Sequence, residues 1–317
     1  MLKYISIALL CASTANAAPS ITLTNDTVSI RSYIPAQPDS LYRGVRFIRC
    51  TMTDDIRAGA TKFYGRLFEN LAPPDPRAAI TGLAEEFDPE LPPGYASAPP
   101  DGAFLKIGVG ILQKIDDAPY DFDRAYPLLD PGVWQSLHLA TTGVVYRHTA
   151  KTPDGRHGAD YRHALLLDND TIIIERALTN TGTEPFATRH YAHHFISIND
   201  APIDSAYSVT YGAAPVPLPP IPETMRLDGA TLAFTAPHAG WIRIAYTNTA
   251  ALPNRYRVWH AAARAGIEVA TDLPVVDACV FATSAALSPE MFSELRLAPN
   301  ENVAWRTVIK FVAESAP

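Results

Sequence analysis

The sequence predicts an all-β protein folded as one large antiparallel sandwich. Short segments rich in β-branched and aromatic residues recur along nearly the whole chain, bounded by Asn, Asp, Gly or Pro. Helical periodicity is scarce, with only short turns indicated at 55–60 and 288–292. Because the strands are numerous and do not alternate with helices, they indicate an antiparallel sandwich rather than a parallel sheet.

The individual strands follow from the same pattern, taken in chain order. Each segment is β-branched, apolar or alternating in polarity over a length that suits a strand. Strands are predicted at 21–23, 27–33, 45–50, 103–111, 136–148, 161–167, 171–178, 188–198, 225–234, 241–246, 256–259, 266–270, 278–282, 292–297 and 303–312.

The first residues have the pattern of a secretory signal. Residues 1–17 contain one lysine, then the apolar run 5–12, then the small-residue site Ala15-Asn16-Ala17. We therefore expect cleavage before Ala18 and a periplasmic or secreted protein. No later run approaches the roughly 20 apolar residues that span a bilayer, so no membrane contact is expected after signal removal.

The length allows one large β domain or two ordinary ones, and strands spread along the chain without a linker-like break indicate one domain over residues 18–317. The 28 prolines outnumber the 17 glycines and cluster at 73–76, 92–100 and 215–222, which are predicted to be loops. None is long enough to be a flexible interdomain linker. The formal net charge of −7, without a basic stripe, argues against a nucleic-acid partner.

The cysteines leave two interpretations open. Removal of the signal takes away Cys11, whose preceding Leu10 disfavours a lipoprotein site, and leaves Cys50 and Cys279. In an oxidising compartment these two could form a disulfide between the first and last thirds of the chain, or remain as buried thiols. Their spacing does not suit a metal site.

The stretch 177–198 is the strongest candidate for chemistry, because an Asn-Thr-Gly turn opens a strand with three histidines among aromatic residues. Side chains alternate across a strand. One face is therefore predicted to carry His190, Ala192 and His194, and the other Tyr191, His193 and Phe195.

Cofactors and metals are not expected. His190 and His194 would lie roughly 13 Å apart along a strand, and a third ligand is missing. The sequence also contains no Gly-x-Ser-x-Gly elbow, P-loop or dinucleotide fingerprint.

Several motifs follow one another as in a known family. The motifs are Tyr42-Arg43-Gly44-Val45-Arg46-Phe47, Gly82-Leu83-Ala84-Glu85-Glu86-Phe87, Phe104 to Gly110, Asn180-Thr181-Gly182 to His193, and Ser288-Pro289-Glu290-Met291-Phe292 through Leu297-Ala298-Pro299-Asn300-Glu301 to Trp305. With these motifs in this order over nearly all of residues 18–317, the chain resembles aldose 1-epimerases and is similar to the galactose mutarotase-like proteins.

The resemblance implies a galactose mutarotase-like super-sandwich with a carbohydrate groove on one sheet. It implies an acid–base pair that opens and recloses a sugar ring, with His193 at the position of the family's active-site histidine. The chain departs from the family at Thr81-Gly82, where an earlier histidine is expected, and between 278 and 286, which contain no glutamate.

Ring opening of a hemiacetal needs one group to take a proton from the anomeric hydroxyl and another to protonate the ring oxygen. We expect His193 as the acid and Glu86 as the base. The alternatives are a hydrogen-bonded core imidazole for His193 and a solvated loop pair for Glu85 and Glu86.

Five further residues are candidates for substrate binding. Lys106 either binds sugar hydroxyls or a carboxylate, or extends its amine to solvent. Arg46 is either a substrate clamp or half of a structural ion pair. Glu85, Tyr191 and His194 complete the set.

Three classes of function follow for a mono- or oligosaccharide ligand. The first is an exported aldose 1-epimerase-like isomerase. The second is a glycan lyase, in which His193 or Tyr191 abstracts a proton beside a carboxylate that Arg46 or Lys106 neutralises. The third is a carbohydrate-binding protein without chemistry. The sequence does not choose an oligomeric state.

Overall fold

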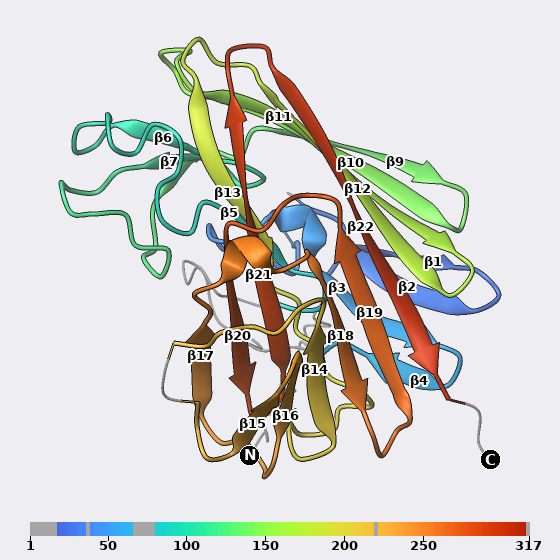
Figure 1. The fold of residues 1–317 in the computed structure, drawn as a ribbon. Helices are drawn as coiled ribbons and strands as arrows, with labels where there is room; N and C mark the ends of the chain where they lie inside the picture. Colours follow the sequence, from blue (N-terminus) through green and yellow to red (C-terminus); the bar gives the residue numbers. More distant parts are fainter. Residues whose placement is uncertain (1–17, 36–38, 66–79, 219–220, 315–317) are drawn as a thin grey trace, which may run out of the picture.

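The computed structural model describes residues 18–35, 39–65, 80–218 and 221–314 (Figure 1). Within these ranges the regular elements are β-strands and two short 3-10 turns, η1 (Arg49–Thr51) and η2 (Thr249–Ala251). All paired strands are antiparallel. The predicted all-β class is therefore confirmed. The predicted signal at residues 1–17 lies outside the described residues.

The largest sheet has ten strands drawn from both halves of the chain. Its C-terminal strand lies between strands that are more than thirty residues earlier in the sequence. The spatial order is β15 (Met225–Asp228), β16 (Thr231–Phe234), β14 (Tyr207–Tyr211), β18 (Arg255–His260), β19 (Ala265–Thr271), β22 (Asn302–Ala313), β12 (Thr171–Asn180), β11 (Gly158–Asp168), β10 (Gly143–Lys151) and β9 (Val133–Leu139).

Three smaller sheets complete the fold. The five-stranded sheet has the order β17 (Trp241–Ala245), β20 (Asp277–Thr283), β21 (Leu287–Leu297), β13 (Phe186–Ala192) and β5 (Glu85–Phe87). The four-stranded sheet contains β1 (Ser20–Thr24), β2 (Val28–Tyr33), β3 (Thr53–Ala58) and β4 (Thr61–Phe63). The three-stranded sheet contains β6 (Ala103–Lys106), β7 (Gly110–Gln113) and β8 (Leu128–Asp130).

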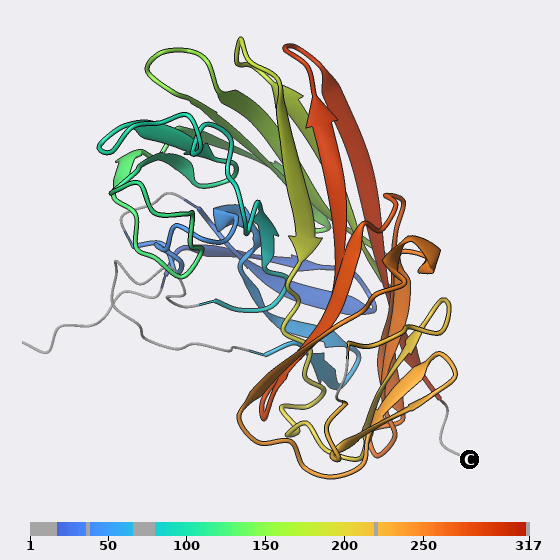
Figure 2. The same cartoon turned by 60° about the vertical axis from the view of Figure 1, so that its left-hand side comes forward.

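Both the five-stranded and the four-stranded sheet pack on the ten-stranded sheet. The Phe87 ring of β5 lies 5.2 Å from Tyr161 of β11, and the Phe63 ring of β4 lies 4.7 Å from Phe311 of β22. Figure 2 shows the N-terminal strands, in blue, against one side of the large sheet. The sandwich core lies between these layers, since burial of apolar surface stabilises the packed faces.

Several predicted boundaries were wrong. Residues 45–48 form a loop that leads into η1, which contains residues 49 and 50, and the predicted turn at 55–60 is mostly β3. The predicted strands 136–148 and 225–234 are each a hairpin of two strands. The predicted turn at 288–292 belongs to β21. For the two hairpins and for β21, pairing with neighbouring strands extends or divides the predicted segments, and the local sequence does not encode these partners.

Cys50 and Cys279 are buried free thiols, so the disulfide alternative is not formed in this structure. In the part of the chain that the structure describes, no helix is long and apolar enough to cross a membrane.

Candidate functional site

β13 lies between β21 and β5, and this position sets the two faces of the site. Tyr191 pairs with Glu86, while His190 pairs with Phe87. Because side chains alternate, Glu86 and Tyr191 point to one side, and Glu85 and His190 point to the other. The neighbours Glu85 and Glu86 therefore belong to two different clusters.

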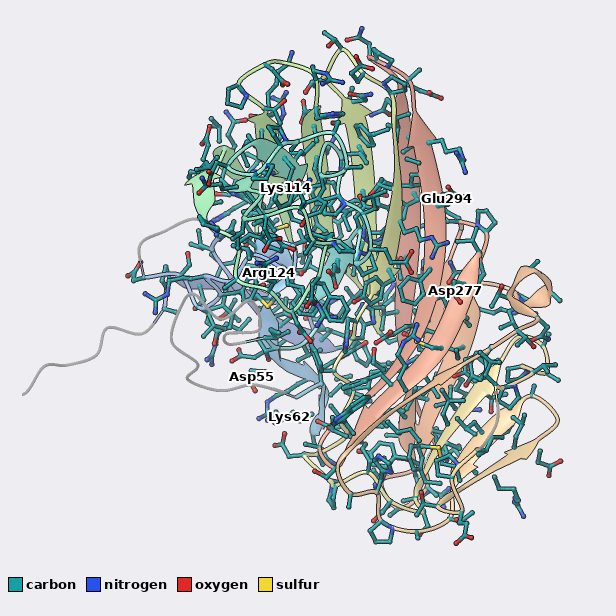
Figure 3. All side chains as sticks on the ribbon, turned by 90° about the vertical axis from the view of Figure 1, so that its left-hand side faces the viewer. Asp55, Lys62, Lys114, Arg124, Asp277 and Glu294 are labelled. Atoms are coloured by element: carbon teal, nitrogen blue, oxygen red, sulfur yellow. The ribbon has the colours of Figure 1, made fainter. Side chains whose placement is uncertain are left out.

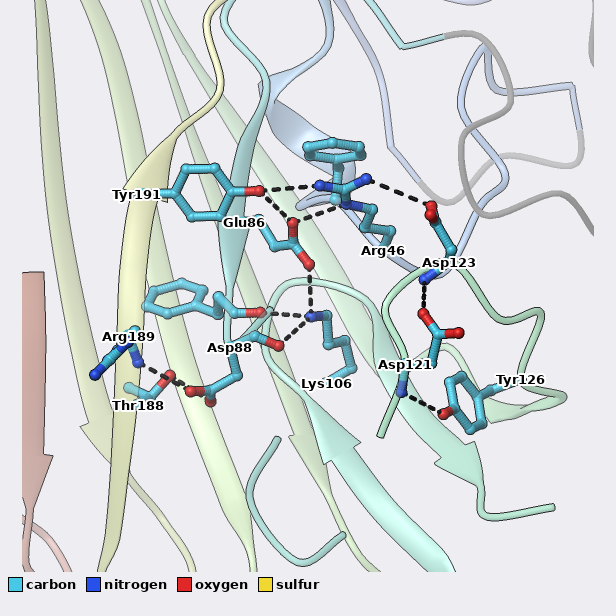
Figure 4. A network of polar contacts seen from close by, with 12 residues as sticks. Arg46, Glu86, Asp88, Lys106, Asp121, Asp123, Tyr126, Thr188, Arg189 and Tyr191 are labelled. Atoms are coloured by element: carbon cyan, nitrogen blue, oxygen red, sulfur yellow. Dashed lines mark hydrogen bonds and ion pairs between the residues drawn. The ribbon is translucent and has the colours of Figure 1, made fainter. Parts of the chain in front are cut away.

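Glu86 is at the centre of a buried polar cluster with Arg46, Lys106 and Tyr191 (Figure 4). Its Oε2 accepts hydrogen bonds from Tyr191 Oη at 2.6 Å and Arg46 Nε at 2.9 Å, and its Oε1 lies 3.1 Å from Lys106 Nζ. Burial alone would raise the pKa of Glu86, but Arg46 and Lys106 outweigh it and lower the pKa. Glu86 is thus held as an anion.

Lys106 is fully buried, so the interpretation in which its amine reaches solvent was wrong. Its Nζ donates to Glu86 and to the backbone carbonyls of Phe87 at 2.5 Å and Asp88 at 2.9 Å. These three acceptors match the three donors of an ammonium group. The amine is therefore fully used within the protein.

The loop after β7 covers this cluster. Arg46 Nη1 lies 3.7 Å from Asp123 Oδ1, and the Arg46 guanidinium lies 4.0 Å from the centre of the Phe122 ring. The Lys106 amine lies 5.3 Å from the Tyr120 ring. As Figure 4 shows, Arg46 connects Glu86 on β5 to this loop.

His193 follows the end of β13 and lies against a different carboxyl group. Its Nε2 is 3.1 Å from Glu290 Oε1 of β21, and Cys279 of β20 donates its Sγ–H to Glu290 Oε2 at 3.1 Å. Phe195 stacks on the imidazole at 4.6 Å, and the Phe47 and Phe281 rings meet it edge-on. The structure thus pairs His193 with Glu290, which corrects the expected pairing with Glu86.

Burial moves the two partners in opposite directions. It lowers the pKa of His193 well below its ordinary value and raises the pKa of Glu290 to about 7. The imidazole is therefore neutral, and the Glu290 carboxyl is only partly protonated near neutral pH. Neither His193 Nδ1 nor Glu290 Oε1 has a hydrogen-bond partner among the described residues, so the 3.1 Å approach of His193 Nε2 to Glu290 Oε1 is a close contact without hydrogen-bond geometry.

The opposite face forms a buried ionic cluster inside the sandwich. Arg176 of β12 donates through Nε to Glu85 Oε2 at 2.8 Å and through Nη2 to Oε1. His190 Nε2 lies 3.1 Å from Glu85 Oε2. His194 is also fully buried, with its ring 5.8 Å from Tyr64, and burial lowers its pKa to about 4.

The structure therefore brings four predicted site residues into one cluster, places His193 beside it and separates the other two. Arg46, Glu86, Lys106 and Tyr191 form one cluster, and the Tyr191 ring lies 6.0 Å from His193, which connects it to the Glu290 pair. Glu85 and His194 lie away from this cluster.

Glu290 was missed because the sequence interpretation assigned 288–292 to a helical turn and sought a late glutamate only at 278–286. The available signal was the carboxylate in Ser288-Pro289-Glu290-Met291-Phe292, within a segment that is buried from 287 to 293. A glutamate inside such an apolar strand is rare without a partner. Asp88, whose pKa burial raises to about 7, was missed as well.

A pocket lies away from these clusters, beside β3 and β4. It has a volume of about 480 Å³ and is lined by Asp55, Lys62, Thr81 and Asp200 among others. Figure 3 shows Asp55 and Lys62 at this edge of the molecule. The Lys62–Asp200 ion pair at 2.7 Å is part of its wall, and no predicted site residue lines it.

Within residues 18–35, 39–65, 80–218 and 221–314, no group of three or more His, Cys, Asp or Glu side chains could hold a metal ion.

No protein-family model matches the sequence, and no curated protein sequence matches it. Solved structures do match its fold. A protein provisionally assigned as an aldose 1-epimerase from Escherichia coli has a TM-score of 0.57 and 14% identity, over 93% of this chain and 99% of that one.

Two further structures agree. A galactose mutarotase related enzyme from Lactobacillus acidophilus has a TM-score of 0.53 and 8% identity, covering 93% of this chain and 97% of that one. A galactose mutarotase-like protein from Lactobacillus casei has a TM-score of 0.51 and 11% identity, covering 92% and 100%. The chain therefore has the galactose mutarotase-like fold, as the resemblance predicts.

Proposed function

We propose that this protein interconverts the anomers of a sugar hemiacetal by acid–base chemistry at His193 and Glu290. The observation that carries the proposal is the 3.1 Å contact between His193 Nε2 and Glu290 Oε1. A fold shared with aldose 1-epimerase-like structures supports a sugar as the substrate. Fold alone does not define a reaction.

In the proposed mechanism one proton passes between Glu290 and His193. Its transfer from the protonated form of Glu290 to the imidazole gives a carboxylate base and an imidazolium acid. The carboxylate takes the proton of the anomeric hydroxyl while the bond between the anomeric carbon and the ring oxygen breaks. The imidazolium protonates the ring oxygen, and the open-chain carbonyl then recloses on either face.

Glu86 is a weaker candidate for the base than Glu290. Its carboxylate is neutralised by Arg46 and Lys106, which lower its pKa and so its tendency to accept a proton. We propose that Glu86 orients Arg46 and Tyr191 beside His193. Because both cations are already paired, a lyase that needs a free cation for a uronate carboxylate is disfavoured.

A carbohydrate-binding protein without chemistry is the second candidate. The exposed fraction of His193 is 6% and that of Glu290 is 4%, which also suits a structural pair in the core. The Phe47, Phe195 and Phe281 rings surround the imidazole, so access of a sugar to this buried pair requires that side chains around it move.

The test is a proton NMR time course on freshly dissolved α-D-glucose and α-D-galactose, against the uncatalysed rate. We expect His193→Asn and Glu290→Gln each to lower the catalysed rate by roughly 10²–10⁴-fold. Glu294→Gln is the matched control, since Glu294 lies on the same strand and its side chain is 32% exposed (Figure 3). Full activity of Glu290→Gln would refute the pair.

A wild-type protein that leaves the anomers at their spontaneous rate would favour the second candidate. Equilibrium binding of the same sugars would then identify a sugar-binding protein, whereas an absence of binding would indicate a different ligand. Ultraviolet absorbance on uronate polymers would reveal unsaturated lyase products.

We also propose that the protein is exported and begins at Ala18. Mass spectrometry of the periplasmic or secreted protein should show the loss of the residues before Ala18. A soluble cytoplasmic pool that retains Met1 would contradict export.

A further inference from the structure

β9 is an exposed edge strand with apolar side chains. It closes one end of the ten-stranded sheet and pairs with β10 on one side only. The exposed fractions are 60% for Val133, 62% for Leu137 and 38% for Leu139. Its outer edge presents unpaired backbone N–H and C=O groups over seven residues.

β9 lacks the exposed charges that four other described edge strands have. Charged residues on an edge normally prevent a second chain from adding to a sheet. β4, β8, β15 and β17 each contain an Asp, Lys or Arg that is at least partly exposed, whereas the charged residues of β5 and β6 are buried and β1 exposes Ser20, Thr22 and Thr24. β9 contains no Asp, Glu, Lys, Arg, Pro or Gly.

From this edge we infer that two copies of the protein associate through antiparallel pairing of β9 with β9, which joins their ten-stranded sheets. The segment is self-complementary, because antiparallel pairing about a twofold axis brings its uncharged residues Val133 to Leu139 opposite the same residues of a second copy. In a chain with a net charge of −7, most surfaces would place like charges opposite one another. The uncharged edge of β9 avoids that repulsion.

Pairing of all seven residues of β9 with those of the second copy fixes the register of this interface. The twofold axis passes beside Ser136, which then lies opposite Ser136 of the partner subunit. Val133 lies opposite Leu139 of the partner subunit, so exposed apolar side chains cover each other on the outer face. Trp134 points to the inner face, where it stacks on His148 at 4.4 Å.

The first experiment measures mass by sedimentation equilibrium between 1 and 100 µM. We expect a wild-type dimer, which becomes monomeric in Leu137→Lys and in Val133→Lys. Trp241→Lys is the matched control, because Trp241 is 74% exposed on the edge strand β17. A monomeric wild type, or a dimer that only Trp241→Lys dissociates, would overturn the proposal.

A cysteine cross-link then tests the register. Directly opposed residues in antiparallel strands have Cα atoms roughly 4.5–5.5 Å apart, within the range of a disulfide. Ser136→Cys should therefore give a covalent dimer on mild oxidation. Leu139→Cys should not, since its symmetry mate would lie about 20 Å away. The native thiols at Cys50 and Cys279 are buried and do not interfere. Cross-linking of Leu139→Cys alone would reject this register.

Discussion

Three buried carboxyl groups near β13 show how contacts decide acid–base behaviour. Glu86 touches two cations and has a lowered pKa. Glu290 has an imidazole and a thiol as neighbours, and burial raises its pKa to about 7. Asp88 accepts from Thr188 Oγ1 and the Arg189 N–H, and its pKa is also raised to about 7 by burial. The residue type alone does not distinguish them.

The raised pKa of Glu290 predicts a pH dependence of stability. The folded protein binds this proton more tightly than the unfolded chain, so the stabilisation is complete below about pH 4.5 and is lost as pH rises through about 7. The rise of the Glu290 pKa from 4.5 to about 7 corresponds to about 3 kcal/mol of folding free energy. Glu290→Gln, which cannot ionise, should lose less stability than wild type between pH 5 and 8 in urea unfolding.

The control for this prediction is Glu294→Gln, which should keep the wild-type pH profile because Glu294 is partly exposed. Asp88 retains its own dependence of the same sign in both variants. Parallel pH profiles of Glu290→Gln and wild type would show that Glu290 does not carry this proton.

At the level of elements, β5 has only three residues and depends on its neighbours for its position. Glu85 connects it to Arg176 of β12 in the facing sheet, and burial would raise the pKa of Glu85 if Arg176 did not hold it well below its ordinary value. This pair fixes β5, which in turn fixes Glu86.

Removing one partner of the Glu85–Arg176 pair should be strongly destabilising. Arg176→Met leaves a buried carboxylate without its cation and is expected to lower the free energy of unfolding by about 3–5 kcal/mol. The loss should be smaller at pH 5 than at pH 8, because protonation removes the unpaired charge. Urea unfolding at both pH values measures it.

Arg147→Met is the matched comparison, since Arg147 forms an ion pair with Asp160 on the surface and its side chain is 53% exposed. Exposed pairs contribute about 1 kcal/mol or less. Equal losses in the two variants would contradict the structural role of Arg176.

At the level of the whole molecule, strands distant in sequence are neighbours in both large sheets. β22 pairs with β12 and β19, and β5 pairs with β13. We therefore expect residues 18–317 to unfold in one cooperative transition, with tryptophan fluorescence and near-ultraviolet circular dichroism giving the same midpoint. Limited proteolysis that yields two separately stable halves would contradict this prediction.

The sequence by itself determined the all-β class, because period-two patterns and turn residues are local properties of the chain. It also predicted the alternation of His190 and Tyr191 along β13, which follows from strand geometry. It did not predict where the strands 136–148 and 225–234 turn into hairpins.

Only the tertiary structure decided which carboxylate meets His193. Glu290 is 97 positions later in the chain, and β21 brings it to 3.1 Å by pairing with β13 and β20. Strand pairing and sheet packing also separate Glu85 from Glu86, bury Lys106 and bring the Cys279 thiol beside Glu290. Long-range strand pairing depends on the packing of the whole sandwich, and no local pattern encodes it.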